Sequence, residues 1–247
     1  MLMFRLDPFA VLLNSIPVLS QIGQQADIKC TTNRLTLMLS HSAPPFIAAI
    51  QMSPEFFNLY DSDHTYHFRF SLDRFYVIMY QMELQGFSSM LFNIMNQIQA
   101  IFLTFERNSN PEPKVMLRQL DLVPYEVELE GHNDYSIFVS IDARDFKRVV
   151  SELSAHSVSV NLSDSQVKFS IENKEMIFTK EERRCIIGGL RKREEYHFVI
   201  TLHPLVFFLD LSHQGKRMWL FMQMDSSSML ILPFGMWTQF WVYFPSH

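Results

Sequence analysis

The chain has 247 residues, of which 48% are hydrophobic and 19% are charged, and its net charge at neutral pH is −5. This balance is typical of a folded protein and excludes a disordered chain, and the length allows two ordinary domains or one large domain. A slightly acidic chain has no overall attraction to nucleic acid, although a locally basic face can still exist.

The cysteines and the hydropathy exclude further classes. Cys30 and Cys185 lie far apart and lack CxxC spacing, so we expect neither a disulfide framework nor a zinc knuckle. Arg5, Asp7 and Pro8 interrupt the apolar start of the chain, and no other stretch is apolar for long enough to cross a bilayer. We therefore expect no signal peptide, no membrane span and a reducing compartment.

In chain order, the first predicted element is an amphipathic helix over 8–22, with an apolar face that includes Phe9 and Ile16 and with Asp7 and Pro8 at its start. Two short strands follow, at 26–30 and 35–39. The segment 66–72 alternates as a strand and leads into a helix over 72–81. Strands at 90–95 and 100–106 and an edge strand at 114–122 complete the first half.

A turn-rich stretch at 108–113 precedes the edge strand, and an acidic connector at 124–133 follows it. The second half then repeats the first. Asp142 sits where a cap is expected, and a helix face of Phe146, Val149, Val150 and Leu153 matches that of Phe9, Leu12, Leu13 and Ile16. Strands are predicted at 158–162, 167–171, 218–224 and 229–234.

The clearest match pairs YHFRFSL at 66–72 with YHFVITL at 196–202, an offset of 130 residues. At the same offset, the helical face of Phe75, Ile78 and Met79 corresponds to Leu205, Phe208 and Leu209. A repeated order of helix, strands, strand, helix and strands predicts an α+β fold of two similar domains, 1–110 and 134–247, joined by residues 111–133. We expect antiparallel sheets, two helices in each domain, and helices on one side of the sheet.

Three stretches carry a resemblance to a known family: LSQIG at 19–23 with SPEFFNLY at 53–60, LDL at 120–122, and DFKRVVSELS at 145–154 with the two strands after it. In order and spacing they resemble the PCNA-fold sliding clamps over nearly the whole chain. That resemblance implies a ring of six similar domains, with helices lining the hole and sheets outside. The segments 19–23 and 40–60 are most similar to the Rad-nine subunit of the heterotrimeric checkpoint clamp, and a divergent PCNA is the second choice.

The resemblance implies a nuclear, non-catalytic subunit that acts in DNA-damage signalling and repair. Its implied partners are two other clamp subunits, a clamp loader, double-stranded DNA threaded through the ring, and client peptides, with no cofactor and no metal. Two alternatives stay open: a PCNA acting as a polymerase processivity factor in replication, and a clamp-fold assembly platform that no longer binds DNA.

Ring closure requires unlike edge strands to pair, which removes both unpaired edges. The candidate edges are 114–122 and 176–180. The residues expected at the subunit interface are Lys114, Met116, Arg118, Met176, Phe178 and Lys180.

A DNA clamp needs basic side chains on the outer faces of its helices, because phosphate contacts supply affinity that is independent of sequence. This chain has few. The first helix has none, and Ser20, Val77, Tyr80 and Asp210 occupy positions where the family usually has lysine. An ordinary solvated surface is the alternative for the candidate DNA-facing residues, which are Arg74, Lys147, Arg148, His213, Lys216 and Arg217. The deficit favours a mixed ring over a homotrimer.

In the family, client peptides dock beside the interdomain connector through main-chain pairing and apolar pockets. An ordinary packed surface is the alternative, and the adjacent prolines at 44 and 45 depart from the usual pattern. Carried over by position, the partner groove includes Ser40, Pro44, Pro45, Leu120, Leu122, Pro124, Pro233 and Phe234.

The remaining polar features favour structural roles. The charged runs 180–184 and 191–195 are interpreted as solvated loops, with DNA or a clamp loader as the alternative. His64 and His67 lie close in sequence but lack further metal ligands. Asp61, Asp63 and His64 lack an accompanying nucleophile, so we expect no catalysis.

Overall fold

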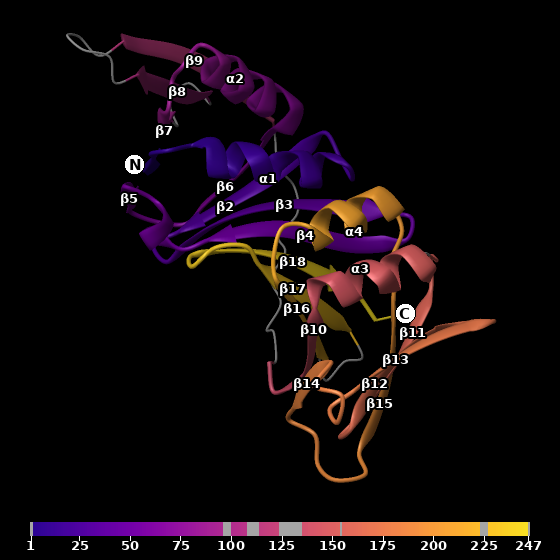
Figure 1. The fold of residues 1–247 in the computed structure, drawn as a ribbon. Helices are drawn as coiled ribbons and strands as arrows, with labels where there is room; N and C mark the ends of the chain where they lie inside the picture. The colour runs from indigo at the N-terminus through magenta and orange to yellow at the C-terminus, as the bar shows by residue number, and fades with distance from the viewer. Residues whose placement is uncertain are drawn as a thin grey trace. The chain divides into compact units, whose positions relative to one another are not determined.

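The computed structural model describes residues 2–95, 100–107, 114–123, 135–153, 155–222 and 227–246, and they form an α+β fold with antiparallel sheets (Figure 1). The expected turn-rich stretch 108–113 and the acidic connector 124–133 lie outside the described residues. Two compact units are present. The first contains Met1–Leu39, Ala49–Glu128 and Met236–Thr238, and the second contains Ser40–Ala48, Leu129–Gly235 and Gln239–His247.

The first half of the chain begins with a strand, and its first helix follows directly. Its elements are β1 (Leu2–Leu6), α1 (Ala10–Ser20), β2 (Gln25–Thr31), β3 (Arg34–Ser42), β4 (Pro45–Met52), the short 3-10 helix η1 (Pro54–Phe56), β5 (Leu59–Ser62), β6 (Tyr66–Ser71), α2 (Leu72–Leu84), β7 (Ser89–Met95), β8 (Ala100–Arg107) and β9 (Lys114–Val123).

The second half has the same alternation. Its elements are β10 (Ile137–Asp142), α3 (Ala143–Glu152), β11 (Val158–Ser163), β12 (Gln166–Ile171), β13 (Lys174–Thr179), β14 (Cys185–Gly188), β15 (Glu195–Ile200), α4 (Leu205–Ser212), β16 (Arg217–Met222), β17 (Ser228–Pro233) and β18 (Thr238–Phe244).

Strand pairing repeats along with element order. In the first half β1 pairs with β5 and β7, and β2 pairs with β3 and β6. In the second half β10 pairs with β14 and β16, and β11 pairs with β12 and β15. The hairpins β7–β8–β9 and β16–β17–β18 also correspond, and all of these pairs are antiparallel. Apart from η1, the described elements therefore occur twice in the same order. Most of their neighbours correspond as well, although β6 pairs with β9 whereas its counterpart β15 ends a four-stranded sheet.

The helix faces expected at the start of each half are confirmed. Phe9, Leu12, Leu13 and Ile16 are buried, and so are Phe146, Val149, Val150 and Leu153. In the second unit α3 packs against β10 and β16, whose inward residues are also apolar and buried. Burial of each helix face against apolar strand residues removes a large nonpolar area from water, which stabilises the unit.

The start of the first helix differs from its prediction. Helix α1 covers Ala10–Ser20, and its N-cap is Phe9, which makes no side-chain cap bond. The predicted start at Asp7 and Pro8 is therefore wrong, because the helix begins two residues later than predicted. The backbone N–H of Asp7 donates to the Asn58 side chain, 2.8 Å away. The cap at Asp142 is confirmed, because its carboxylate accepts from the backbone N–H of Arg144 at 2.9 Å.

The apolar face predicted for the fourth helix, which was Leu205, Phe208 and Leu209, is correct only at Phe208. Leu205 is exposed and Leu209 is half-buried, whereas Phe207, Phe208 and Leu211 are buried. The physical reason is Pro204, which is the N-cap of α4 and disfavours a helical residue before it. Helix α4 therefore begins at Leu205, three residues later than the 130-residue offset predicts, and a different face turns inward.

The predicted edge strand at 114–122 is correct for most of its length. Strand β9 pairs with β8 from Lys114 to Asp121, but its last residues, Leu122 and Val123, also pair with β6. The second predicted edge is β13, which ends its four-stranded sheet in the order β13-β12-β11-β15. Lys180 lies beyond this strand, and its backbone N–H donates to Ser165 at 2.9 Å.

Replacing Asp142 with alanine removes the side-chain cap of α3, and we expect the free energy of unfolding to fall by about 1 kcal/mol. The N–H of Arg144 lowers the pKa of the Asp142 carboxyl. Its contribution is therefore present above the unfolded pKa of about 3.9 and is lost as pH falls through the lower folded value. Urea unfolding at several pH values measures this. The control is Glu181→Ala in an exposed turn; equal losses in both variants would contradict the cap.

Alanine substitutions at Gly189 and Gly86 separate the cost of a left-handed backbone from the cost of a steric clash. Both have positive φ, +80° and +81°. A Cβ at Gly189 would lie 1.8 Å from the carbonyl oxygen of Ser136, whereas one at Gly86 would lie 3.4 Å from the Arg107 side chain. Thermal unfolding of Gly86→Ala should show a loss of about 1 kcal/mol for the left-handed backbone. Gly189→Ala should lose clearly more, and an equal loss would show that the close approach relaxes without cost.

Candidate nucleic-acid interface

Basic side chains gather where the N-terminus of α3 meets the C-terminus of α4 in the second unit. They surround an open, shallow cavity on the surface of this unit. Its lining residues are Asp142, Ala143, Arg144, Lys147, Ser212, His213, Gly215 and Lys216. Three of the residues expected to face DNA, namely Lys147, His213 and Lys216, are thus brought together.

Backbone pairing explains this convergence. In the register of β10 with β16, Asp142 lies opposite Arg217. One step further, the backbone N–H of Ala143 donates to the carbonyl of Lys216 at 3.0 Å. The first turn of α3 is therefore held beside the turn that joins α4 to β16, and α3 also packs along α4.

Lys147 and His213 are in direct contact. The ammonium nitrogen of Lys147 lies 2.9 Å from Nε2 of His213, and both side chains are exposed. An ammonium group can only donate, so Nε2 accepts and carries no proton in this arrangement. Within the described part of the chain, neither Lys147 nor Lys216 forms an ion pair with a carboxylate.

Among the described residues that line the cavity, the only carboxylate is already engaged. Oδ1 of Asp142 accepts from the backbone N–H of Arg144, which lowers the pKa of this carboxyl and keeps it ionised. The Arg144 guanidinium also approaches the same oxygen at 3.3 Å, but its side chain is 93% exposed. Three cations against one capping carboxylate leave this surface positive.

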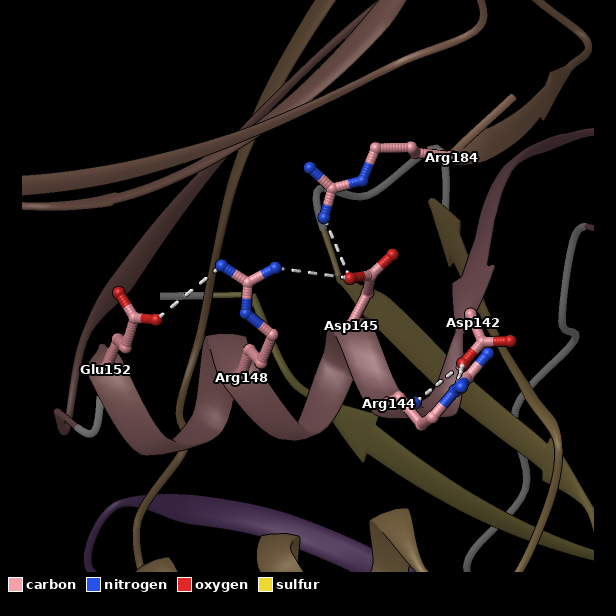
Figure 2. Close-up of polar contacts among 6 residues, drawn as sticks. All are labelled: Asp142, Arg144, Asp145, Arg148, Glu152 and Arg184. Atoms are coloured by element: carbon pink, nitrogen blue, oxygen red, sulfur yellow. Dashed lines mark hydrogen bonds and ion pairs between the residues drawn. The ribbon is translucent and has the colours of Figure 1, made fainter. Parts of the chain in front are cut away.

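Arg148, by contrast, belongs to an ion-pair chain along α3 (Figure 2). Its guanidinium lies 3.6 Å from Asp145 and 4.0 Å from Glu152. Arg184 reaches the same Asp145 carboxylate at 2.8 Å from the turn after β13, and its guanidinium lies 4.7 Å from the centre of the Phe178 ring. The charge of Arg148 is therefore largely compensated within the unit.

The other two candidate cations are also engaged. Arg217 donates to the hydroxyl of Ser140 at 2.8 Å and to its carbonyl at 2.9 Å, which fixes it on β10. Arg74 lies in the first unit, 3.7 Å from Asp121, with 70% of each side chain exposed. Such an exposed pair is weak, so Arg74 can still exchange its partner.

Sequence reasoning did not single out Arg144. It stands two residues after the cap Asp142, so its place in the first turn of α3 was visible in the sequence. Its approach to Lys216 depends on the pairing of β10 with β16, which the sequence pattern did not predict.

The helices of the first unit expose apolar groups. Helix α1 contains no charged residue, and Val77 and Tyr80 of α2 are 47% and 44% exposed. Tyr80 also stacks on Tyr76 with ring centres 5.9 Å apart. The exposed surfaces of these two helices therefore carry few cations, as the sequence predicts.

The residues of the predicted partner groove are divided between the units. Leu120 and Leu122 belong to the first unit, where Leu120 is buried. The second unit contains Phe234, whose ring lies 4.8 Å from that of Phe240. Pro124 lies outside the described residues. The second unit also contains the other groove residues, which are Ser40, Pro44, Pro45 and Pro233.

The residues predicted for the subunit interface differ in exposure. Phe178 is buried beneath Arg184, whereas Met116, Arg118 and Met176 are half-buried and Lys180 is exposed. Of Lys114 only the strand position is described. At β13, the part of the predicted interface that another chain could reach is therefore the backbone edge of the strand, together with the side chains of Met176 and Lys180 on either side of Phe178.

Among the described residues, few side chains are suited to metal binding or to nucleophilic catalysis. No cluster of three or more His, Cys, Asp or Glu suited to a metal ion occurs among them. Both cysteines are buried, and burial raises the pKa of the Cys30 and Cys185 thiols, which makes them poor nucleophiles. His64 stacks on Tyr66 and contacts Asp63 at 2.7 Å. No helix in the described ranges is both long and apolar enough to cross a membrane.

Comparisons with known proteins do not assign the chain to a family. No protein-family model matches the chain, and no curated protein is significantly similar to it.

Proposed function

We propose that this chain is a non-catalytic subunit of a ring-shaped DNA sliding clamp, and within that class a subunit of the heterotrimeric checkpoint clamp of DNA-damage signalling. The observation that carries the proposal is the repetition of element order and strand pairing between the two halves. A chain made of two like units can extend into a closed ring when unlike ends of different chains pair.

Strands β9 and β13 supply suitable ends. Among the described residues, β13 pairs with β12 only, and β9 pairs on its second side at Leu122 and Val123 only. Val115 and Leu117 are exposed on β9, and Ile177 is exposed on β13. Unpaired strand edges flanked by apolar side chains favour association with another strand.

The cavity at the ends of α3 and α4 supports contact with DNA phosphates. Its cations project from a helix end and a turn, and among the described residues only Asp142 supplies a carboxylate to this cavity. Lysine and arginine contacts to phosphate give affinity without sequence preference, which a clamp that slides requires.

A mixed ring follows from the distribution of charge. Helix α1 has no cation, and the one cation of α2, Arg74, faces Asp121. A homotrimer would repeat this weakly charged surface three times, whereas partner subunits could supply the missing positive field. The clamp loader, the client peptides and the nuclear location belong to the same proposal.

A second candidate is an assembly platform that has lost DNA binding. The observation that favours it is the exposure of Val11, Val77 and Tyr80 on α1 and α2. Apolar and aromatic side chains on a surface are typical of protein contacts rather than phosphate contacts. Salt-dependent retention on DNA separates the two candidates.

The first test compares the two lysines of the cavity with an arginine of α3 whose charge is balanced by nearby carboxylates. We expect Lys147→Ala and Lys216→Ala each to weaken binding to duplex DNA and to reduce the salt slope by about one. Arg148→Ala should change the slope less, because its charge is balanced by Asp145 and Glu152. Fluorescence anisotropy over a salt series measures this with the complete ring loaded on nicked circles. DNA retention that does not depend on salt would contradict the clamp and favour the platform.

The second test concerns assembly. The chain alone should be monomeric, and mixing it with candidate clamp subunits should give one complex of three different chains in native mass spectrometry. Ile177→Lys should weaken that complex, because a charge on the terminal strand β13 opposes strand addition. Ile186→Lys on β14, also exposed, is the matched control. A stable homotrimer retained on circular DNA would overturn the heterotrimer.

A further inference from the structure

The contact between Lys147 and His213 has a chemical consequence for anion binding. At 2.9 Å the lysine ammonium donates to Nε2 of the ring, which must be unprotonated to accept. A protonated His213 cannot accept this bond, and its N–H would instead point a second positive group at the ammonium. Protonation of His213 at Nε2 would therefore break the hydrogen bond with Lys147.

The charged groups around His213 come from several elements of the second unit. Helix α3 contributes Lys147 and Arg144, and the turn before β16 contributes Lys216. Asp142, at the end of β10, is the one carboxylate lining the cavity, and it is engaged by the N–H of Arg144. On α4 itself, Asp210 contributes a further carboxylate one turn before His213, and its backbone carbonyl accepts from the backbone N–H of His213 at 3.1 Å.

We propose that this cavity binds a phosphate group together with a proton that His213 takes up at Nε2, so that anion binding and histidine protonation promote each other. The inference rests on the proposed function in that the phosphate is expected to belong to DNA. When the proton binds, the Lys147–His213 hydrogen bond breaks. Both nitrogens then donate to oxygens of the anion, whose negative charge offsets the two adjacent cations.

The coupling is confined to the second unit. The first unit repeats the underlying backbone contact, since the N–H of Phe9 donates to the carbonyl of Ser88 at 3.0 Å, as Ala143 does to Lys216. Its corresponding turn has Gln85 after α2 and Ser88 before β7, neither of which titrates. Proton-linked binding is therefore expected from one position in each chain.

The test follows the His213 ring by NMR in the full chain labelled at histidine. Its signal is identified by its loss in His213→Gln. Titrations are recorded without ligand, with dimethyl phosphate, whose single charge stays constant, and with a short DNA duplex. We expect both ligands to move the His213 titration to higher pH by about one unit, equivalent to about tenfold tighter binding at low pH. The two ligand arms distinguish an isolated phosphate diester from DNA.

Binding measured between about pH 6 and pH 8 completes the test, since this range covers histidine titration. His213→Gln should lose the pH dependence of duplex binding, and His156→Gln, in the same unit, should retain it. An unchanged His213 titration with both ligands, or a pH dependence that survives in His213→Gln, would overturn the inference. Failure of the complete ring to bind DNA at any pH, with a normal response to dimethyl phosphate, would instead overturn the proposed function alone.

Discussion

The register of β10 against β16 is the constraint on which the candidate site depends. It places Asp142 opposite Arg217 and lets the N–H of Ala143 bond to the carbonyl of Lys216. A helix that starts directly after one strand is thereby held beside the turn that enters the next. A slip of one residue would exchange the two faces of β10 and remove this contact, because side chains alternate along a strand.

The two units combine the same backbone plan with different surfaces. Each has a strand leading into a helix, and in each a backbone N–H at that junction bonds to the turn before a neighbouring strand. In the second unit this junction has cations around a shallow cavity, whereas the helices of the first unit expose uncharged groups such as Val77 and Tyr80. Backbone plan and surface charge therefore vary independently between the two units.

Ion pairs decide which cations remain available to a ligand. Arg148 and Arg184 share the Asp145 carboxylate, and Arg217 is fixed on Ser140, so these three guanidinium groups stabilise the unit. Lys147 and Lys216 have no such carboxylate among the described residues. A count of basic residues overestimates the positive surface, because partners distant in sequence, such as Arg184 and Asp145, neutralise one another.

The sequence by itself determined the α+β class, the recurring order of helices and strands, and the buried faces of α1 and α3, because helical and strand periodicity reflect which side chains leave water. It also identified Asp142 as a cap, since capping is local. The inward face of α4 was mispredicted because the 130-residue offset was carried past Pro204, which delays the helix. Only the tertiary structure decided that Leu122 is paired and that Arg184 shares the Asp145 carboxylate with Arg148. It also decided that Arg144, Lys147, His213 and Lys216 surround one cavity, since strand register and ion pairs join residues whose separation in sequence carries no periodic signal.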